Sequence, residues 1–234
     1  EYAAMTRDLD TAVGILLNRI DRLGIAANTY VVFMSDNGAV APPRSTENVP
    51  LSGGKATFWE GGIRVPLIIR GPGVKPDSFC RQNVIGYDLF PTFCELAGVP
   101  SDSHFSIEGT NLVPLLLERV DGSAFRRERE ELVFHFPHYA LGPDQTPQSA
   151  ILASNLKLIR FHETNETRLF DLTKDIGEKN DLKEQMPDKA AALTENLDAY
   201  LARINAQLPS SNPDYDPATA EQGSRQRRGR ASEL

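Results

Sequence analysis

Apolar residues recur at helical spacing near the start of the chain, in the stretch LDTAVGILLNRIDRLGI. They are Leu9, Val13, Leu16, Leu17, Ile20 and Leu23. Gly24 follows directly and suits a helix C-cap. The next run, YVVFM at residues 30–34, is mostly β-branched and aromatic and predicts a strand. The pattern therefore predicts a helix and a strand joined by a short connection.

A long segment, Gly38 to Val65, is rich in glycine, proline and serine and lacks a periodic pattern. Compact domains seldom carry such a loop without a use for it. The apolar run VPLIIRG then predicts a second buried strand, which GPG ends. After it, YDLFPTFCELAG predicts a helix from near Asp88 to Gly98. Pro91 would lie in its first turn, where a missing N–H is tolerated.

The pattern changes after about Asp102. Short alternating runs follow, ELVFHF, SAILAS, LKLIRF and TRLFDL, and they predict strands. Two of them read as a hairpin that turns at Ser154–Asn155. A helix is predicted at about residues 186–206, with apolar positions at Ala190, Leu193, Leu197, Leu201 and Ile204. Residues beyond Pro209 lack the apolar content to fold alone.

Composition narrows the class of protein. A chain of 234 residues suits one large domain, or a domain plus a smaller module. Its net charge of −7 argues against a nucleic-acid partner, which would call for a basic face. No apolar run reaches the roughly 20 residues of a membrane span. The given residues carry no signal-peptide pattern, and the start at Glu1 is expected to mark a fragment or a processed product. Cys80 and Cys94 could pair or stay as buried free thiols.

Asp36 and Asn37 stand side by side where the first predicted strand ends. In open α/β sheets, ligands gather beyond the carboxyl ends of the strands. A carboxylate beside an amide oxygen offers two hard donors of the kind that Ca²⁺ and Mg²⁺ prefer. The alternative is an Asx-turn, in which either side chain bonds its own backbone and Gly38 supplies a positive φ. Taken alone, this stretch favours the turn.

The glycine-rich loop downstream adds a candidate anion contact. Lys55 directly follows a double glycine, and a lysine held near a metal site can meet an anionic group as a compact point charge. The alternative for Lys55 is an exposed loop lysine. For Glu60 and Arg64 an internal ion pair that fixes the loop is the preferred interpretation. Trp59 is expected to pack under the loop.

Several stretches together carry a family resemblance. In order, they are VVFMSDNG, LSGGKATFWEGGIRVPLIIRGPG, YDLFPTFCELAGV and EGTNLVPLL. This ordered set resembles the C-terminal half of an arylsulfatase-type sulfatase, in the alkaline-phosphatase-like superfamily. The later stretches HFPHY, SAILASNLKLIRF and RLFDLTKDIGEKNDL are similar to that family's small C-terminal subdomain. The resemblance runs from Tyr2 to about Pro217.

The resemblance implies an α/β fold. Residues 1–125 would form the C-terminal part of an alkaline-phosphatase-like sandwich, and residues 126–208 a small subdomain of an antiparallel sheet plus a helix. Residues 209–234 are expected to be a disordered tail because of their low apolar content. Asp36 and Asn37 match the second pair of ligands to the family's divalent cation, usually Ca²⁺. Lys55 matches the lysine that contacts the sulfate. Related phosphatases and phosphonate hydrolases commonly have His in place of the Asn.

The chain departs from the family at the nucleophile. Sulfatases carry it upstream, as a cysteine or serine in a C/S-x-P-x-R motif that is oxidised to formylglycine. Cys80 precedes RQN and Cys94 precedes ELA, so neither fits. The isolated chain is therefore expected to bind metal poorly and to be inactive. A phosphatase or phosphonate monoester hydrolase, and a truncated non-catalytic remnant, are the alternatives.

The implied substrate is a sulfated small molecule or carbohydrate. His135 and His138, in HFPHY, are candidates for contacting it where the small subdomain approaches the site. Their alternatives are a half-buried strand residue for His135 and a surface residue for His138. His104 and His162 are expected on the surface. Bacterial relatives are usually exported, which implies a periplasmic or secreted protein.

Overall fold

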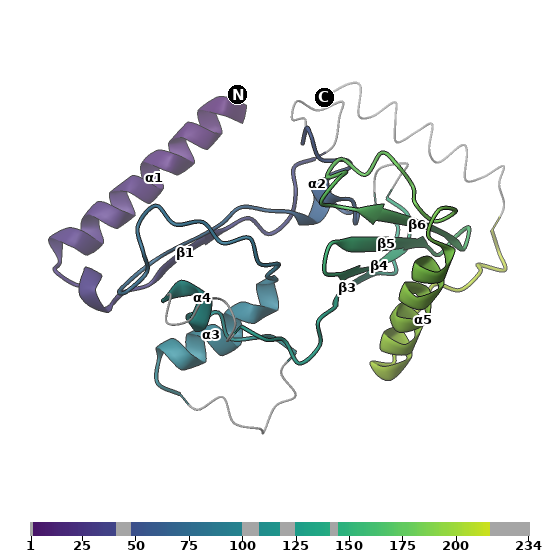
Figure 1. Ribbon diagram of the computed structural model, residues 1–234. Coiled ribbons are helices and arrows are strands. Elements are labelled where there is room, and N and C mark those ends of the chain that lie inside the picture. Colours follow the sequence, from purple (N-terminus) through teal and green to yellow (C-terminus); the bar gives the residue numbers. More distant parts are fainter. Residues whose placement is uncertain (1, 41–47, 100–107, 118–124, 141–144, 216–234) are drawn as a thin grey trace.

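The structure contains two separate antiparallel sheets with helices beside them (Figure 1). It is a computed structural model that describes residues 2–40, 48–99, 108–117, 125–140 and 145–215. The strands are β1 (Val31–Met34), β2 (Leu67–Arg70), β3 (Leu132–Phe136), β4 (Gln148–Ala153), β5 (Leu156–Phe161) and β6 (Glu166–Asp171). The helices are α1 (Tyr2–Arg22), α2 (Glu60–Ile63), α3 (Leu89–Leu96), α4 (Val113–Leu116) and α5 (Pro187–Arg203), with short 3₁₀ turns at Ala26–Asn28 and Gly86–Asp88.

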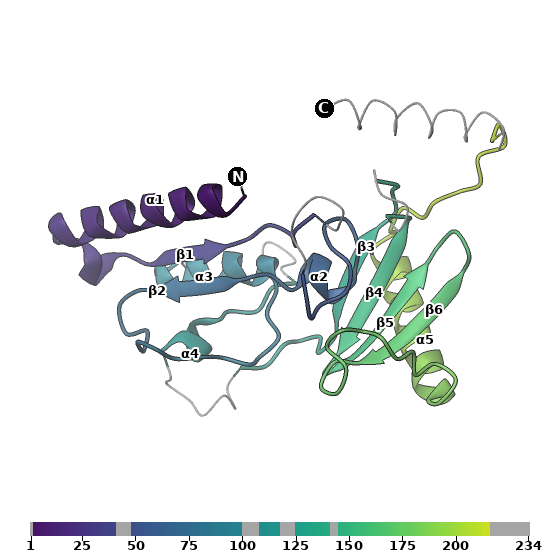
Figure 2. The same ribbon diagram turned by 90° about the horizontal axis from the view of Figure 1, so that it is seen from above.

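The first sheet is only the β1–β2 pair, with Val31 opposite Arg70 and Met34 opposite Leu67. The sequence suggested an open α/β sheet here, but the described residues supply no parallel neighbour for β1. Helix α1 lies beside the pair (Figures 1 and 2), where Asp21 accepts a hydrogen bond from Arg70 at 2.7 Å. The predicted helix–strand unit is confirmed, although its helix begins earlier than the apolar pattern indicated.

None of the residues of α1, all of which the structure describes, is buried. Its large apolar side chains are mostly open to solvent, including Met5, Leu9, Ile15 and Leu16, and so is Leu23 just after its end. Met34 in β1 and Ile68 in β2 are exposed as well. An apolar stripe with this spacing is typical of a helix that packs against a core. In the described part of the chain, that core does not cover it.

The second sheet runs β3-β4-β5-β6 in chain order, with every neighbour antiparallel. Its alternation gives two apolar faces. One face packs on α5 through Ile151, Leu158, Leu169, Ala190, Leu193, Leu197 and Leu201. The predicted helix is thus confirmed with its core positions, except Ile204, which lies beyond α5 and is 42% exposed. The hairpin is also confirmed, with Ser154 at φ 53°.

The other face of this sheet packs on the glycine-rich loop rather than on a helix of ordinary length. Phe58 and Trp59 contact a buried cluster made by Leu132, Ala150, Leu152, Ile159, Phe170 and Leu172. In Figure 2, α2 and the chain around it stand on one side of the sheet and α5 on the other. The small sheet therefore holds the loop in place.

The helix at Asp88 is confirmed, with Pro91 in the first turn of α3 and Gly98 at φ 68° after its end. Asp88 is fully buried, where it accepts hydrogen bonds from the backbone of Ile85 and Thr110 and pairs with Arg127. The two cysteines are free thiols. Cys80 is exposed, so the expectation that both are buried is wrong for it, while Cys94 is half-buried.

Candidate functional site

Strand β1 ends in a tight turn that carries Asp36 and Asn37. The Ser35 hydroxyl donates to the Asn37 carbonyl at 2.8 Å, and Asn37 Nδ2 donates to the Gly38 carbonyl at 3.1 Å. Asp36 is exposed and Asn37 half-buried. The turn uses the amide nitrogen of Asn37 and leaves its oxygen, the atom that would bind a cation, without a donor among the described residues. A backbone turn and a ligand pair are therefore compatible here.

The glycine-rich loop packs against this turn, backbone on backbone. The Lys55 N–H donates to the Ala39 carbonyl at 2.9 Å, and the Gly38 N–H donates to the Gly62 carbonyl at 2.9 Å. The Lys55 side chain is exposed. Two backbone contacts thus join the turn of Asp36 and Asn37 to the loop of Lys55. The structure brings these three predicted residues together from segments separated in sequence.

Glycines permit this crossing because the backbones approach too closely for a side chain. A Cβ on Gly38 would lie 1.7 Å from the Gly61 carbonyl oxygen. A Cβ on Gly61 would lie 2.5 Å from the Ser52 carbonyl oxygen, and one on Gly62 would lie 2.2 Å from that of Thr57. The second double glycine is therefore explained by close packing of backbone on backbone.

The predicted Glu60–Arg64 ion pair is confirmed at 2.6 Å. Trp59 packs as predicted, with its ring 5.4 Å from that of Phe170. Glu60 has a further partner that the sequence did not suggest. Lys157 Nζ, in β5, lies 2.8 Å from the Glu60 carboxylate and also pairs with Glu178.

Burial and charge act in opposite directions in this cluster. Burial alone would raise the pKa of Glu60, but Lys157 and Arg64 together lower it below its usual value. For Glu178 burial prevails over Lys157 and raises the pKa. One signal in the sequence pointed to Lys157. It lies two and four residues before Ile159 and Phe161, so strand alternation puts it on their apolar face.

The histidines of the small subdomain differ from one another. His135 bonds the Ser149 hydroxyl through Nδ1 at 2.7 Å and the Gln207 carbonyl through Nε2 at 2.9 Å. Both of its ring nitrogens thus have protein partners. His162 bonds the same hydroxyl at 2.7 Å and is half-buried, so its expected place on the surface is wrong. Burial, and then His135, lower the pKa of His162. His138 is exposed, and His104 lies outside the described residues.

The described residues do not form a complete metal site. Asp36 and Asn37 present two side-chain oxygens at the end of β1, and across the described ranges no group of three or more His, Cys, Asp or Glu could hold a metal ion. Their chemistry fits a hard divalent cation that takes its remaining ligands from elsewhere, because Ca²⁺ prefers 6–8 oxygens. No helix within those ranges is long and apolar enough to cross a bilayer.

Known proteins resemble this chain in sequence and in fold. The chain is 30% identical to the rat (Rattus norvegicus) steryl-sulfatase over 92% of its length. A protein solved in complex with its substrate, D-glucosamine-2-N,6-O-disulfate, superposes with a TM-score of 0.67 at 25% identity, over 84% of this chain and 38% of that chain. The fold is thus a part of the alkaline-phosphatase-like α/β fold.

Family profiles agree with these relatives. The sulfatase family matches residues 1–99, and the family described as N-sulphoglucosamine sulphohydrolase, C-terminal, matches residues 54–207. A sulfatase of Formosa agariphila is 36% identical over 88% of the chain. The chain belongs to the sulfatase family. It spans 40% of the length of the Formosa protein and 43% of that of the rat protein.

Proposed function

We propose that this chain is the second part of a sulfatase that hydrolyses sulfate esters, with Asp36, Asn37 and Lys55 in its active site. The observation that carries the proposal is the backbone crossing at the end of β1. There the Lys55 N–H donates to Ala39, two residues after Asn37, at 2.9 Å. Membership of the sulfatase family supports the reaction type. The side-chain oxygens of Asp36 and Asn37 would bind a metal ion, and the loop beside them carries the positively charged Lys55.

Each of these residues has a distinct task in the proposal. Asp36 and Asn37 hold a divalent cation, and Ca²⁺ is the metal that their hard oxygen donors favour. When bound, such a cation supplies Lewis-acid stabilisation of the sulfuryl oxygens. The Lys55 ammonium binds the same anionic group as a point charge and stabilises the charge that develops as the S–O bond breaks. The nucleophile, a formylglycine in this family, would come from upstream.

For the substrate we propose a sulfated carbohydrate. The solved structure with a disulfated glucosamine supports a sugar, whereas the relationship to a steryl-sulfatase shows that the alcohol varies within the family. The bacterial relative from Formosa agariphila supports a bacterial enzyme. We extend the proposal to a periplasmic or secreted location, which fractionation of the source cell would test.

The reaction is tested by comparing two proteins with an aryl sulfate as substrate. The 234-residue chain alone is expected to show no hydrolysis above background, because the nucleophile and part of the cation shell are missing. The complete enzyme, in which an upstream sulfatase half precedes this chain, is expected to hydrolyse the ester and to lose activity with a chelator. Metal-dependent turnover by the chain alone would contradict the proposed division of labour. An inactive complete enzyme would contradict the function.

His138 is the histidine that we assign to substrate recognition, because it is exposed while both ring nitrogens of His135 have protein partners. His138→Ala in the complete enzyme is expected to raise KM for a sugar sulfate about tenfold, the loss of one hydrogen bond to a charged or polar group. KM for a small aryl sulfate should change little. Equal losses on both substrates would contradict a recognition role.

A further inference from the structure

The buried cluster around Lys157 lies outside the predicted active-site residues, yet it contacts the loop that carries one of them. Lys157 is fully buried in β5. Its ammonium donates to the Phe58 carbonyl at 2.9 Å and to the Glu60 carboxylate at 2.8 Å, and it pairs with the carboxylate of Glu178. The ammonium thus has two hydrogen-bond acceptors and a second carboxylate as ion-pair partner.

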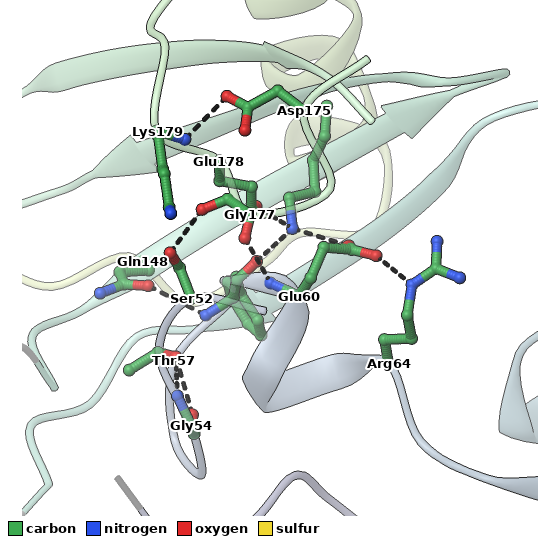
Figure 3. Close-up of polar contacts among 12 residues, drawn as sticks. Ser52, Gly54, Thr57, Glu60, Arg64, Gln148, Asp175, Gly177, Glu178 and Lys179 are labelled. Atoms are coloured by element: carbon green, nitrogen blue, oxygen red, sulfur yellow. Dashed lines mark hydrogen bonds and ion pairs between the residues drawn. The ribbon is translucent and has the colours of Figure 1, made fainter. Parts of the chain in front are cut away.

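The carboxylates of this cluster extend it into the loop. Glu178 accepts a hydrogen bond from the Glu60 N–H at 2.6 Å, at the start of α2. Glu60 also pairs with Arg64, one turn further along. Figure 3 shows Glu60 between Glu178 on one side and Arg64 on the other. Because Lys157 and Glu178 each contact both a side chain and the backbone, at Phe58 and Glu60 respectively, the cluster fixes the path of the chain into α2.

The backbone of α2, which this cluster holds, also takes part in the crossing beside the Asp36–Asn37 turn. Gly61 N–H donates to the Ser52 carbonyl at 2.7 Å, and the Gly62 carbonyl accepts from Gly38 at 2.9 Å. Gly61 and Gly62 directly follow Glu60, and there is no room at either for a Cβ. A shift of Glu60 would therefore move the contact surface for both the Asp36–Asn37 turn and the Lys55 loop.

We propose that Lys157 is a positioning residue of the sulfatase site. Through Glu60, it sets the placement of Lys55 relative to Asp36 and Asn37. This inference rests on the proposed function for its catalytic consequence. Its structural part, that Lys157 orders the loop crossing, stands apart from the reaction. A lysine between two carboxylates in a dry interior costs more desolvation than an apolar side chain would, so its presence calls for a task besides packing.

The structural part is tested by amide hydrogen exchange on the chain, followed at Gly38, Lys55 and Gly61. Lys157→Met would leave the buried Glu178 carboxylate without its cation and so endanger folding, whereas Glu60 keeps Arg64. The test variant is therefore Lys157→Met/Glu178→Gln. The control Glu178→Gln keeps the contacts of Lys157 with Phe58 and Glu60. The second control, Arg160→Met, removes the β5–α5 ion pair with Asp198 instead.

The double variant is expected to exchange at least about tenfold faster at these three amides. The amides that join β4 to β5 should change much less. Both controls should leave the three amides protected. Equal acceleration over the whole small sheet would overturn the proposal, because Lys157 would then serve stability alone. Unchanged exchange at the three amides would overturn it as well.

The catalytic part is tested in the complete enzyme with an aryl sulfate. The double variant is expected to lower kcat by about 100-fold, the cost of a misplacement of about 1 Å, with a smaller change in KM. Arg160→Met should keep kcat. If the unmodified complete enzyme is inactive, the proposed function fails while the exchange result still decides the structural part. A fall in kcat equal to that of Arg160→Met would overturn the positioning role.

Discussion

Replacing Lys55 with alanine in the complete enzyme is expected to lower kcat for an aryl sulfate by roughly 10²- to 10³-fold, as for other single groups that stabilise transition-state charge. The side chain is exposed and its backbone contacts do not depend on its ammonium, so folding should be unaffected. Steady-state kinetics with bound Ca²⁺ measured in parallel would check this.

A matched control separates the loss of the Lys55 ammonium at the site from the loss of one positive charge anywhere on the protein. Lys189→Ala removes an exposed lysine from α5 and changes the net charge by the same amount. It is expected to leave kcat unchanged. If both variants lose activity alike, or if Lys55→Ala also loses its bound metal, the assigned contact with the sulfuryl group is wrong.

Changing the two proposed ligands should act on the metal first. Asp36→Asn in the complete enzyme removes a charged donor and is expected to weaken Ca²⁺ binding by about 100-fold or more, since even groups behind a ligand are worth about 10- to 100-fold. Activity should fall with it and recover in part at high Ca²⁺. Asn37→His replaces an oxygen donor by a nitrogen donor and should shift preference toward Zn²⁺ or Mn²⁺. Calorimetric titration with each ion would measure both effects.

The control for this pair is Asp214→Asn, which changes the same charge on an exposed residue near the end of the described chain. Its Ca²⁺ affinity should match that of the unmodified enzyme. Unchanged Ca²⁺ affinity in Asp36→Asn would remove Asp36 from the metal site and leave the interpretation of this stretch as a simple turn.

Much of the fold could be predicted because local patterns and tertiary structure agree. Ala190, Leu193, Leu197 and Leu201 of α5 face one sheet, as their spacing predicted, and the Ser154–Asn155 turn lies between two alternating strands. The pairing of β1 with β2 is different. Their partners lie more than 30 residues apart in sequence, and nothing in either strand's composition specifies antiparallel pairing.

The candidate site divides in the same way. Motifs in the sequence pointed to Asp36, Asn37 and Lys55 as candidates, whereas no motif pointed to Lys157 or Glu178. Lysine and glutamate are almost never fully buried unless paired, so their default place is the surface. The one sign in the sequence that Lys157 is buried was its position on the apolar face of its strand. Finding its partner required the loop to be folded over the sheet, which no local pattern encodes.

The contacts that hold the loop also set the order in which the site can be made. Lys157 and Glu60 are 97 residues apart, and the Ser52 hydroxyl donates to the Gly177 carbonyl over a separation of 125 residues. Synthesis runs from the N-terminus, and segments fold as they emerge. The ribosome therefore releases Asp36 and Lys55 long before the residues that fix the crossing between them. A nascent chain that ends before β5 carries the proposed site residues without the anchor for their loop, so the crossing between them is fixed only after β5 has been made.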